Sequence, residues 1–459
     1  MVDVPVKPSD RSRDSAIGQY THKRSATDIG LRLLAPLLGR KFLDRYNVRD
    51  PFNRGLKFGV TQFFSAAGAS TRQFKKIQAI GKPPTRLEPS GTDYFDLTPD
   101  DDQKMIVETV KEFAEEFLRP AAREADEAAT YPPELIGKSA ELGVTAIKVP
   151  EAFDGIAESR TIVTSALVAE ALAYGDMGLA LPILAPGGVA AALTHWGSAD
   201  QQATYLTEFA GDNVPQACVA IAEPHPLFDP TMLKTTAVRT PSGYRLDGVK
   251  SLVPAAESCE LFLVAAQLNG SPALFIVEAA SAGLSVTTDR SMGIRAAALG
   301  QVTLNKVSVP LDARIGGDDA DHMQNYSDAI ALSRLGWAAL AVGTCQAVLD
   351  YVIPYVKERE AFGEPIARRQ SVAFMCADIA IELDGLRLVT WRGAARADRG
   401  LPFAREAALA RKLAADKGMR IGLDGVQLLG GHGYTKEHPV ERWYRDLRAI
   451  GVAEGVVVL

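Results

Sequence analysis

The sequence predicts an α+β fold in which two helical domains flank a middle β domain. Ala-rich segments with helical periodicity run through residues 96–213, and the same periodicity returns in longer segments over 316–459. Residues 214–315 instead carry short runs rich in β-branched residues, separated by turn formers. Because no helical pattern intervenes between these runs, they favour an antiparallel barrel or sandwich over a parallel sheet. Residues 1–95 remain as an N-terminal extension.

The secondary structure elements have marked boundaries. Thr98 is the expected N-cap of the first helix, with Pro99 in its first turn. The most apolar stretch, Ala331–Leu349, contains Ser333 and Arg334, which predicts a buried helix rather than a membrane span. The expected strands are 217–221, 235–239, 244–248, 261–265, 273–277 and 301–304, and the later helices are expected to break at 362–365, 400–402 and 430–433.

The composition excludes several classes of protein. The chain has 459 residues, of which 47% are hydrophobic, enough to bury a sizeable core. Its net charge is −6, yet residues 1–95 carry 17 Lys/Arg against 8 Asp/Glu, so the rest is strongly acidic and should repel nucleic acid. The four cysteines form no Cys-x-x-Cys pair, which fits a reducing, cytoplasmic location. The six histidines include no His-Glu-x-x-His pair, and we expect no metal site.

The basic extension has three interpretations. Its amphipathic segment 29–43 is suited to an anionic membrane surface. The extension can instead pack on the acidic body or on a partner subunit, or it can be a partly ordered tail. Packing is favoured because the many aromatic residues in this extension need burial, and its aspartates disfavour a transit peptide.

Two segments are candidates for a functional site, because the usual nucleotide-binding and serine-hydrolase motifs are missing from the sequence. In Gln427–Tyr434, adjacent glycines let a ligand approach the backbone closely, although a helix C-cap and turn is the simpler interpretation. In Glu454-Gly455, apolar neighbours would raise the pKa of the Glu454 carboxyl group and suit it to act as a base, although a surface glutamate is the simpler interpretation.

Four blocks of sequence together resemble the acyl-CoA dehydrogenase family over about residues 96–459. Their order and spacing are plausible for the family, whose fold also has a β domain between helical domains and ends in a four-helix bundle. The blocks are Leu97-Thr-Pro99 with Gly143–Pro150; Met292-Gly-Ile-Arg295 with Leu299–Leu304 and Val307–Pro310; Arg359-Glu-Ala-Phe-Gly-Glu-Pro-Ile366 with Gln370; and Gln427-x-x-Gly-Gly-x-Gly-Tyr434 with Pro439-Val-Glu-Arg442, Arg445-Asp446 and Glu454-Gly455.

The resemblance implies an FAD enzyme of lipid catabolism that oxidises an acyl-CoA thioester to the 2,3-enoyl-CoA. A glutamate takes the α-proton, the β-hydride passes to flavin N5, and an electron-transfer flavoprotein accepts the electrons. By motif match the base is Glu454, since Ser333, at the position that some members use instead, cannot serve. Arg334 falls where the family has an arginine lining the acyl pocket, with a buried structural ion pair as the alternative.

The resemblance also implies contacts to FAD. Arg359 would meet the pyrophosphate of a neighbouring subunit's FAD, flanked by Phe362 and Gln370, although a surface arginine is the alternative. The residues matching the contacts to the adenosine part are Gln427, Gly430 and Gly431.

The flavin-loop motifs depart from the family pattern. Thr-Glu-Pro-Gly-Ala-Gly-Ser-Asp reads Ala222-Glu-Pro-His-Pro-Leu-Phe-Asp229, and Trp-Ile-Thr reads Leu252-Val-Pro254. Ala222, Val253 and Pro254 therefore occupy flavin-binding positions without the family's hydroxyl donors. Some bacterial relatives in the family are mixed tetramers, so the resemblance implies a homo- or heterotetramer in which a paralogous partner completes a site. The alternatives are a non-catalytic scaffolding subunit and a flavin oxidase or monooxygenase on the same fold.

Overall fold

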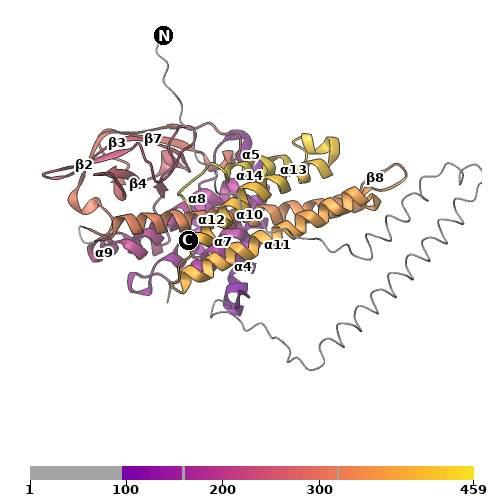
Figure 1. Ribbon diagram of the computed structural model, residues 1–459, viewed down its shortest axis with the longest axis horizontal. Coiled ribbons are helices and arrows are strands. Elements are labelled where there is room, and N and C mark those ends of the chain that lie inside the picture. Colours follow the sequence, from indigo (N-terminus) through magenta and orange to yellow (C-terminus); the bar gives the residue numbers. More distant parts are fainter. Residues whose placement is uncertain (1–95, 158–160, 318–319) are drawn as a thin grey trace, which may run out of the picture. The chain divides into compact units, whose positions relative to one another are not determined.

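The computed structural model describes residues 96–157, 161–317 and 320–459 (Figure 1). The predicted extension 1–95, with its membrane, packing and tail interpretations, lies outside the described residues. The N-terminal helices are α4 (Asp101–Phe113), α5 (Arg119–Ala128), α6 (Glu134–Glu141), α7 (Ile162–Gly175), α8 (Met177–Trp196) and α9 (Ala199–Ala210), with a π-helical turn, Ala114–Leu118, between α4 and α5 and 3₁₀ turns at Ala146–Lys148 and Glu151–Phe153.

The first helix starts two residues later than its sequence predicts. Asp100 is the N-cap, because its carboxylate accepts from the Gln103 backbone N–H (2.8 Å) while the Gln103 side chain accepts from the Asp100 N–H (3.1 Å). This reciprocal capping box satisfies two backbone donors at once. Thr98 is instead tied outside the helix, where its N–H donates to Asp96.

The middle domain is a seven-stranded sheet in the order β1-β4-β2-β3-β7-β6, with β5 also paired to β4. Four pairings are antiparallel, as expected, whereas β1 and β2 each pair with β4 in parallel. The parallel pairs need no helix, because intervening strands and loops supply the connection. The strands are β1 (Ala217–Ala220), β2 (Thr236–Thr240), β3 (Gly243–Val253), β4 (Leu261–Leu268), β5 (Ser271–Glu278), β6 (Leu284–Thr288), which the sequence did not predict, and β7 (Gly300–Pro310).

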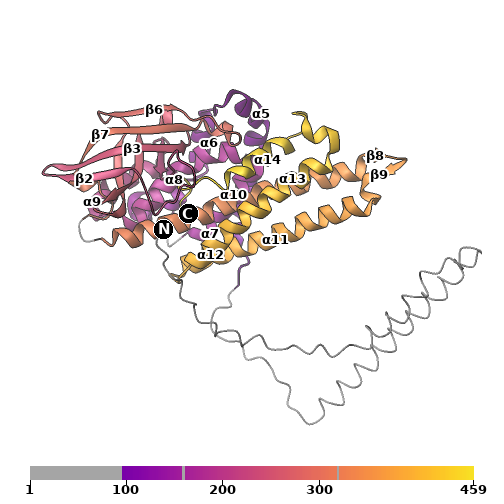
Figure 2. The ribbon, with the colours of Figure 1, turned by 45° about the horizontal axis from the view of Figure 1, so that its top comes forward.

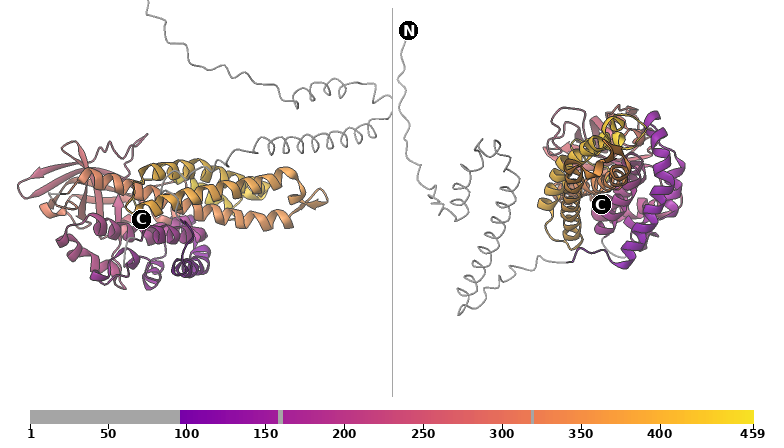
Figure 3. Two further views of the ribbon diagram at one scale, coloured as in Figure 1. Left: turned by 60° about the horizontal axis from the view of Figure 1, so that its bottom comes forward. Right: turned by 90° about the vertical axis from the view of Figure 1, so that its right-hand side faces the viewer.

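The C-terminal domain is built on the 37-residue helix α10, which extends from beneath the sheet to the β8–β9 hairpin (Figure 1). The expected breaks fall between its later helices, which pack around α10 (Figures 2 and 3). The elements are α10 (His322–Glu358), β8 (Glu360–Ala361), β9 (Glu364–Pro365), α11 (Gln370–Asp398), α12 (Ala404–Leu413), a π-helical turn (Ala414–Gly418), α13 (Met419–Leu428), a 3₁₀ turn (Gly430–Tyr434) and α14 (Val440–Ala449).

Helices α8 and α10 are long and apolar enough to cross a membrane by length and composition alone. Their apolar windows are 94% and 67% buried within the described fold, as is usual for core helices. Figure 3 shows the N-terminal helices, in indigo and violet, along one side of the long α10–α11 pair.

Helix α14 is tied to the N-terminal domain by a buried ion pair. Arg442 Nε donates to Asp176 Oδ2 at 2.9 Å, and the two side chains are 8% and 0% exposed. The other carboxylate oxygen of Asp176 accepts from the Leu179 N–H and caps α8. Removing one partner would leave a buried charge unpaired, so this contact fixes α14 against α8.

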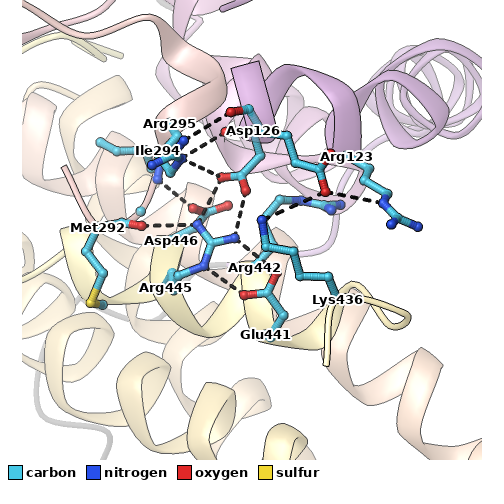
Figure 4. A network of polar contacts seen from close by, with 12 residues as sticks. Arg123, Asp126, Met292, Ile294, Arg295, Lys436, Glu441, Arg442, Arg445 and Asp446 are labelled. Atoms are coloured by element: carbon cyan, nitrogen blue, oxygen red, sulfur yellow. Dashed lines mark hydrogen bonds and ion pairs between the residues drawn. The ribbon is translucent and has the colours of Figure 1, made fainter. Parts of the chain in front are cut away.

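The next turn of α14 reaches both other domains (Figure 4). The Arg445 guanidinium forms a two-pronged ion pair with Asp126 of α5, at 2.9 and 2.8 Å. Asp446 accepts from the backbone N–H of Ile294, in the loop before β7, at 2.5 Å. A side chain at Gly293 would overlap the Arg445 carbonyl, so glycine lets this loop approach. We call these α14 contacts, made by Arg442, Arg445 and Asp446, the α14 clamp.

The segment after Gly455 lies in the core. Val456–Leu459 are each at most 2% exposed. Gly455 bridges to Ala220 of β1, and the Val456 N–H donates to the Val219 carbonyl. Val456 has a φ of +67°, a conformation that β-branched residues rarely adopt, so the surrounding contacts must hold it there.

Two glycines admit this segment between the helices. A Cβ at Gly188 of α8 would overlap the Val456 carbonyl oxygen, and one at Gly336 of α10 would overlap the Val457 carbonyl oxygen. The segment Val456–Leu459 therefore fills the apolar space between α8 and α10 beside Glu454.

We expect Gly336→Ala to lower the free energy of unfolding by about 1–3 kcal/mol, since the new methyl group overpacks the core. The matched control is Gly385→Ala on α11, where an added Cβ would have no neighbour within 4 Å in the described part of the chain. There we expect a gain of about 0.5–1 kcal/mol, because alanine is the better helix former. Urea denaturation of both variants checks these opposite signs, and a stabilising Gly336→Ala would contradict the packing.

A second expectation concerns pH. Burial, and next the Asp176 carboxylate, raise the pKa of Asp446 well above its ordinary value. Folded Asp446 thus holds a proton that the unfolded chain releases, and its stabilising contribution is lost as pH rises through the folded pKa. Between about pH 5 and pH 8 the free energy of unfolding should fall by up to about 1.4 kcal/mol per pH unit from this group.

Asp446→Asn should flatten this slope, because the amide oxygen still accepts from Ile294 without titrating. Asp416→Asn, at a half-exposed site, is the control and should leave the slope unchanged. Urea denaturation at several pH values measures both, and equal slopes in Asp446→Asn and wild type would disprove the assignment.

Candidate active site

Glu454 lies in the loop after α14, and its side chain is only 7% exposed. The following peptide is fixed by α10, since its carbonyl oxygen, on Gly455, accepts from Ser333 Oγ at 2.6 Å and from Trp337 Nε1 at 2.9 Å. The base that the motif predicts is therefore held from two sides, by α10 and by its β-bridge to β1. Ser333, predicted to be unable to act as a base, has a structural role.

The surroundings of Glu454 are more charged than the sequence predicted. Arg334 Nη2 and Nε donate to Oε1 at 2.9 and 3.1 Å, and Oε2 receives only a 3.3 Å bond from the same Nε. Arg411 of α12 lies 3.7 Å from Oε1 and donates to the Ala453 carbonyl. Of the apolar neighbours, Ile450 and Val456–Val458 are buried, and two arginines that are distant in sequence also converge on this loop.

The predicted Arg334 thus forms the ion pair that the sequence left as its alternative role. Its side chain is 30% exposed, so this pair borders the surface on one side. Arg334 also contributes to lowering the pKa of Asp229, after the hydrogen bonds from Thr231. Buried Tyr326, whose hydroxyl donates to the Pro230 carbonyl at 2.6 Å, has its pKa raised by burial first and then by Glu454.

The altered flavin loop is anchored by a buried pair, Glu223 and Lys250, at 2.9 Å. Glu223 also accepts from the N–H groups of Lys234 and Thr235. Burial opposes the charge on Glu223, but Lys250 and these hydrogen bonds lower its pKa to about 2. Burial lowers the pKa of Lys250 to about 8 against the attraction of Glu223.

The three residues predicted at the isoalloxazine end cluster at the ends of β1 and β3. Ala222, Val253 and Pro254 are all buried, and the Ala222 carbonyl accepts from the Ser251 N–H at 2.9 Å. Their side chains offer no hydrogen-bond donor, and the Leu252 N–H is taken by Asp289. This end of the site therefore has backbone groups and apolar surface, without the family's hydroxyl donors.

A second cluster lies at the other end of α10. A pocket of about 620 Å³ is lined by five of the residues predicted to meet FAD: Arg359, Phe362, Gln427, Gly430 and Gly431. None of the described residues has an atom within 4 Å of a Cβ at either glycine, so the backbone is open to a ligand. The predicted Gln370 begins α11 and is exposed, outside this lining.

The pocket contains a residue that the sequence did not single out. The Arg369 guanidinium lies 5.6 Å from the Phe362 ring and pairs with Glu364. Phe362 is 94% exposed with a φ of +59°, a conformation that places a bulky ring in solvent at the hairpin tip. Arg359, Arg369 and the open glycines fit the anionic and planar parts of a dinucleotide.

The two clusters lie far apart along α10. Arg334 lies in the first half of α10 and Arg359 caps its C-terminal end, 25 residues later, which is about 37 Å at 1.5 Å per residue. The Glu454 cluster and the Arg359 pocket are therefore separate half-sites within a single chain.

Comparison with known proteins agrees with this fold. Family descriptions of acyl-CoA dehydrogenase N-terminal, middle and C-terminal domains match residues 100–212, 218–307 and 323–456. A probable acyl-CoA dehydrogenase of Bacillus subtilis is 31% identical over 368 residues, covering 79% of this chain and 96% of that protein.

Solved structures show the same architecture. Butyryl-CoA dehydrogenase of Megasphaera elsdenii superposes with a TM-score of 0.72 at 27% identity, covering 79% of this chain and 96% of its own. A glutaryl-CoA dehydrogenase of Mycobacterium smegmatis in complex with FADH2 has a TM-score of 0.70 at 24% identity, covering 77% and 90%, and supports the fold. The chain belongs to the acyl-CoA dehydrogenase family, a family of FAD-dependent oxidoreductases.

Proposed function

We propose that this protein catalyses α,β-dehydrogenation of an acyl-CoA thioester, with Glu454 as the base that removes the α-proton. One observation carries the proposal: a buried carboxylate is held rigidly at the family's base position, with one oxygen less engaged than the other. A base of this kind must be positioned before the substrate arrives, because proton transfer needs contact at hydrogen-bond distance.

In this mechanism Oε2 of Glu454 receives the α-proton, since Arg334 binds mainly Oε1. Ser333 and Trp337 act as positioning residues by holding the Gly455 carbonyl, and so the loop that carries the base. The exposed side of Arg334 supplies the approach for the thioester. The bound flavin supplies the acceptor for the hydride that leaves the β-carbon.

We further propose that FAD is shared between subunits of a tetramer. The Arg359 pocket would hold the pyrophosphate and adenosine of an FAD whose reactive ring lies at a neighbouring subunit's Glu454. The separation of the two half-sites along α10 supports this arrangement. Gln370, at the start of α11, would flank the pyrophosphate from outside the pocket lining.

A second candidate function is a half-site subunit that completes the site of a paralogous active partner. Two observations favour it: Val456–Leu459 fill the apolar space beside Glu454, and Ala222, Val253 and Pro254 lack side-chain donors for a flavin. In such an assembly this chain contributes the Arg359 pocket and its partner contributes the catalytic centre.

The electron acceptor and the location complete the proposal. An electron-transfer flavoprotein is the acceptor that the family resemblance implies for electrons from the reduced flavin. A cytoplasmic location is supported by the four cysteines, all of which are free thiols.

We expect Glu454→Gln to lower the rate of acyl-CoA dehydrogenation by about 10²–10⁴-fold, because the amide cannot accept the proton. Flavin content and thermal stability should stay close to wild type. Glu108→Gln, on the exposed face of α4, is the matched control. Dye-coupled turnover of the assembled protein measures the effect, and near-wild-type turnover would favour the half-site subunit.

We expect Arg359→Gln to weaken FAD binding by about 10–100-fold, since it removes a charge-assisted contact to phosphate. Arg405→Gln, at an 81% exposed position, should bind FAD normally. Flavin fluorescence during reconstitution measures the affinity.

Co-expression of these two impaired variants, assayed at limiting FAD, tests whether the site is shared. In mixed assemblies of Glu454→Gln and Arg359→Gln chains, a shared site leaves some sites with both native residues, and activity returns. If each chain builds its whole site, every site is defective and activity stays lost.

A further inference from the structure

The loop that joins α13 to α14, seen as a ribbon in Figure 2, carries three side chains of a kind that binds metals. His432, Glu437 and His438 each offer one ligand atom, and these atoms all lie within 4.8 Å of one another. The sequence hides this group, because its spacing is not that of a familiar zinc motif. The expectation of no metal site rested on such motifs alone.

The geometry is close to that of a bound ion. His432 Nδ1 lies 3.6 Å from Glu437 Oε2, and the two imidazole rings are edge to face with centroids 5.8 Å apart. A tetrahedral zinc ion binds imidazole nitrogen and carboxylate oxygen at about 2.0–2.2 Å, so its ligand atoms lie about 3.4 Å apart. His432 and Glu437 are 47% and 71% exposed, which leaves them free to close this small gap.

His438 is held in the way that metal-binding histidines are held. The Tyr351 hydroxyl lies 2.6 Å from His438 Nδ1, and the rings of Tyr351 and Tyr355 pack edge-on against the imidazole. A hydrogen bond to one ring nitrogen orients the ring and leaves the other nitrogen for an ion.

The backbone and the neighbouring charge also suit a cation. The Thr435 N–H and Oγ1 both donate to the His432 carbonyl, closing the turn that carries this histidine. Lys436, the cation within the loop, lies 3.8 Å from Glu127 on α5. Its ammonium group is thus directed to α5 and is paired there.

We propose that His432, Glu437 and His438 bind a divalent transition-metal ion of the zinc class, with water completing the coordination. Two imidazoles and one carboxylate form the ligand set that Zn²⁺ prefers. His432 also lines the Arg359 pocket, so the ion would stiffen one wall of that pocket. This inference does not depend on the proposed enzymatic activity.

Calorimetric titration of the untagged, chelator-treated full-length protein with ZnCl₂ tests the proposal. We expect one ion per chain at pH 7.5. Co²⁺ in place of Zn²⁺ should give visible absorption bands of a low-coordinate site. Absence of stoichiometric binding at pH 7.5 would overturn the proposal.

Variants locate the site. His432→Ala and His438→Gln should each lower Zn²⁺ affinity at least about 10-fold, and Tyr351→Phe, which removes only the orienting hydroxyl, should lower it by about 10-fold. Lys436→Ala, in the same loop but outside the ligand set, should leave the affinity unchanged. Wild-type affinity in both histidine variants would place the ion elsewhere and refute the assignment.

Discussion

The buried contacts of the α14 clamp are the interaction on which the rest of the structure depends. The side chains of Arg442 and Asp176 are almost completely buried, so removing either one would leave an unpaired buried charge and destabilise the fold. Arg445 and Asp446 extend the same helix to α5 and to the loop before β7. Because three domains meet on ten residues of α14, their relative placement is set there. Glu454 follows five residues after this helix ends, and inherits that placement.

The loop that carries Glu454 combines this external constraint with local strain. Val456 has a left-handed backbone conformation directly after Gly455. The hydrogen bonds from Ser333 and Trp337 to the Gly455 carbonyl fix the peptide that joins Gly455 to Val456. Such strain costs about 1–3 kcal/mol and persists only where neighbouring contacts enforce it. The position of Glu454 and the unusual backbone conformation of Val456 therefore depend on each other, and both depend on contacts with the enclosing helices α8 and α10.

Much of this arrangement could be predicted from the sequence, for identifiable reasons. Helical periodicity and turn residues located the long helices and most strands, because those signals are local. The match of short motifs to the family named Glu454 as the candidate base, and that signal is local as well. Arg411 could not be found this way, since it lies in an ordinary amphipathic helix and meets Glu454 only through packing. The parallel pairing of β4 likewise depends on which strands, distant in sequence, lie side by side. His432 and His438 come close to each other only in the folded loop.

The length of α10 has a consequence for the protein as a population of molecules. The 25 residues of α10 from Arg334 to Arg359 keep Glu454 and the Arg359 pocket apart within a chain. Under the proposed sharing of FAD, completing a reactive centre is a second-order event between chains. The fraction of competent centres would then follow the law of mass action, rising with protein concentration and with flavin, which binds only the assembled form. A folded chain that is not assembled would be inactive, and it would become active once it joined other chains.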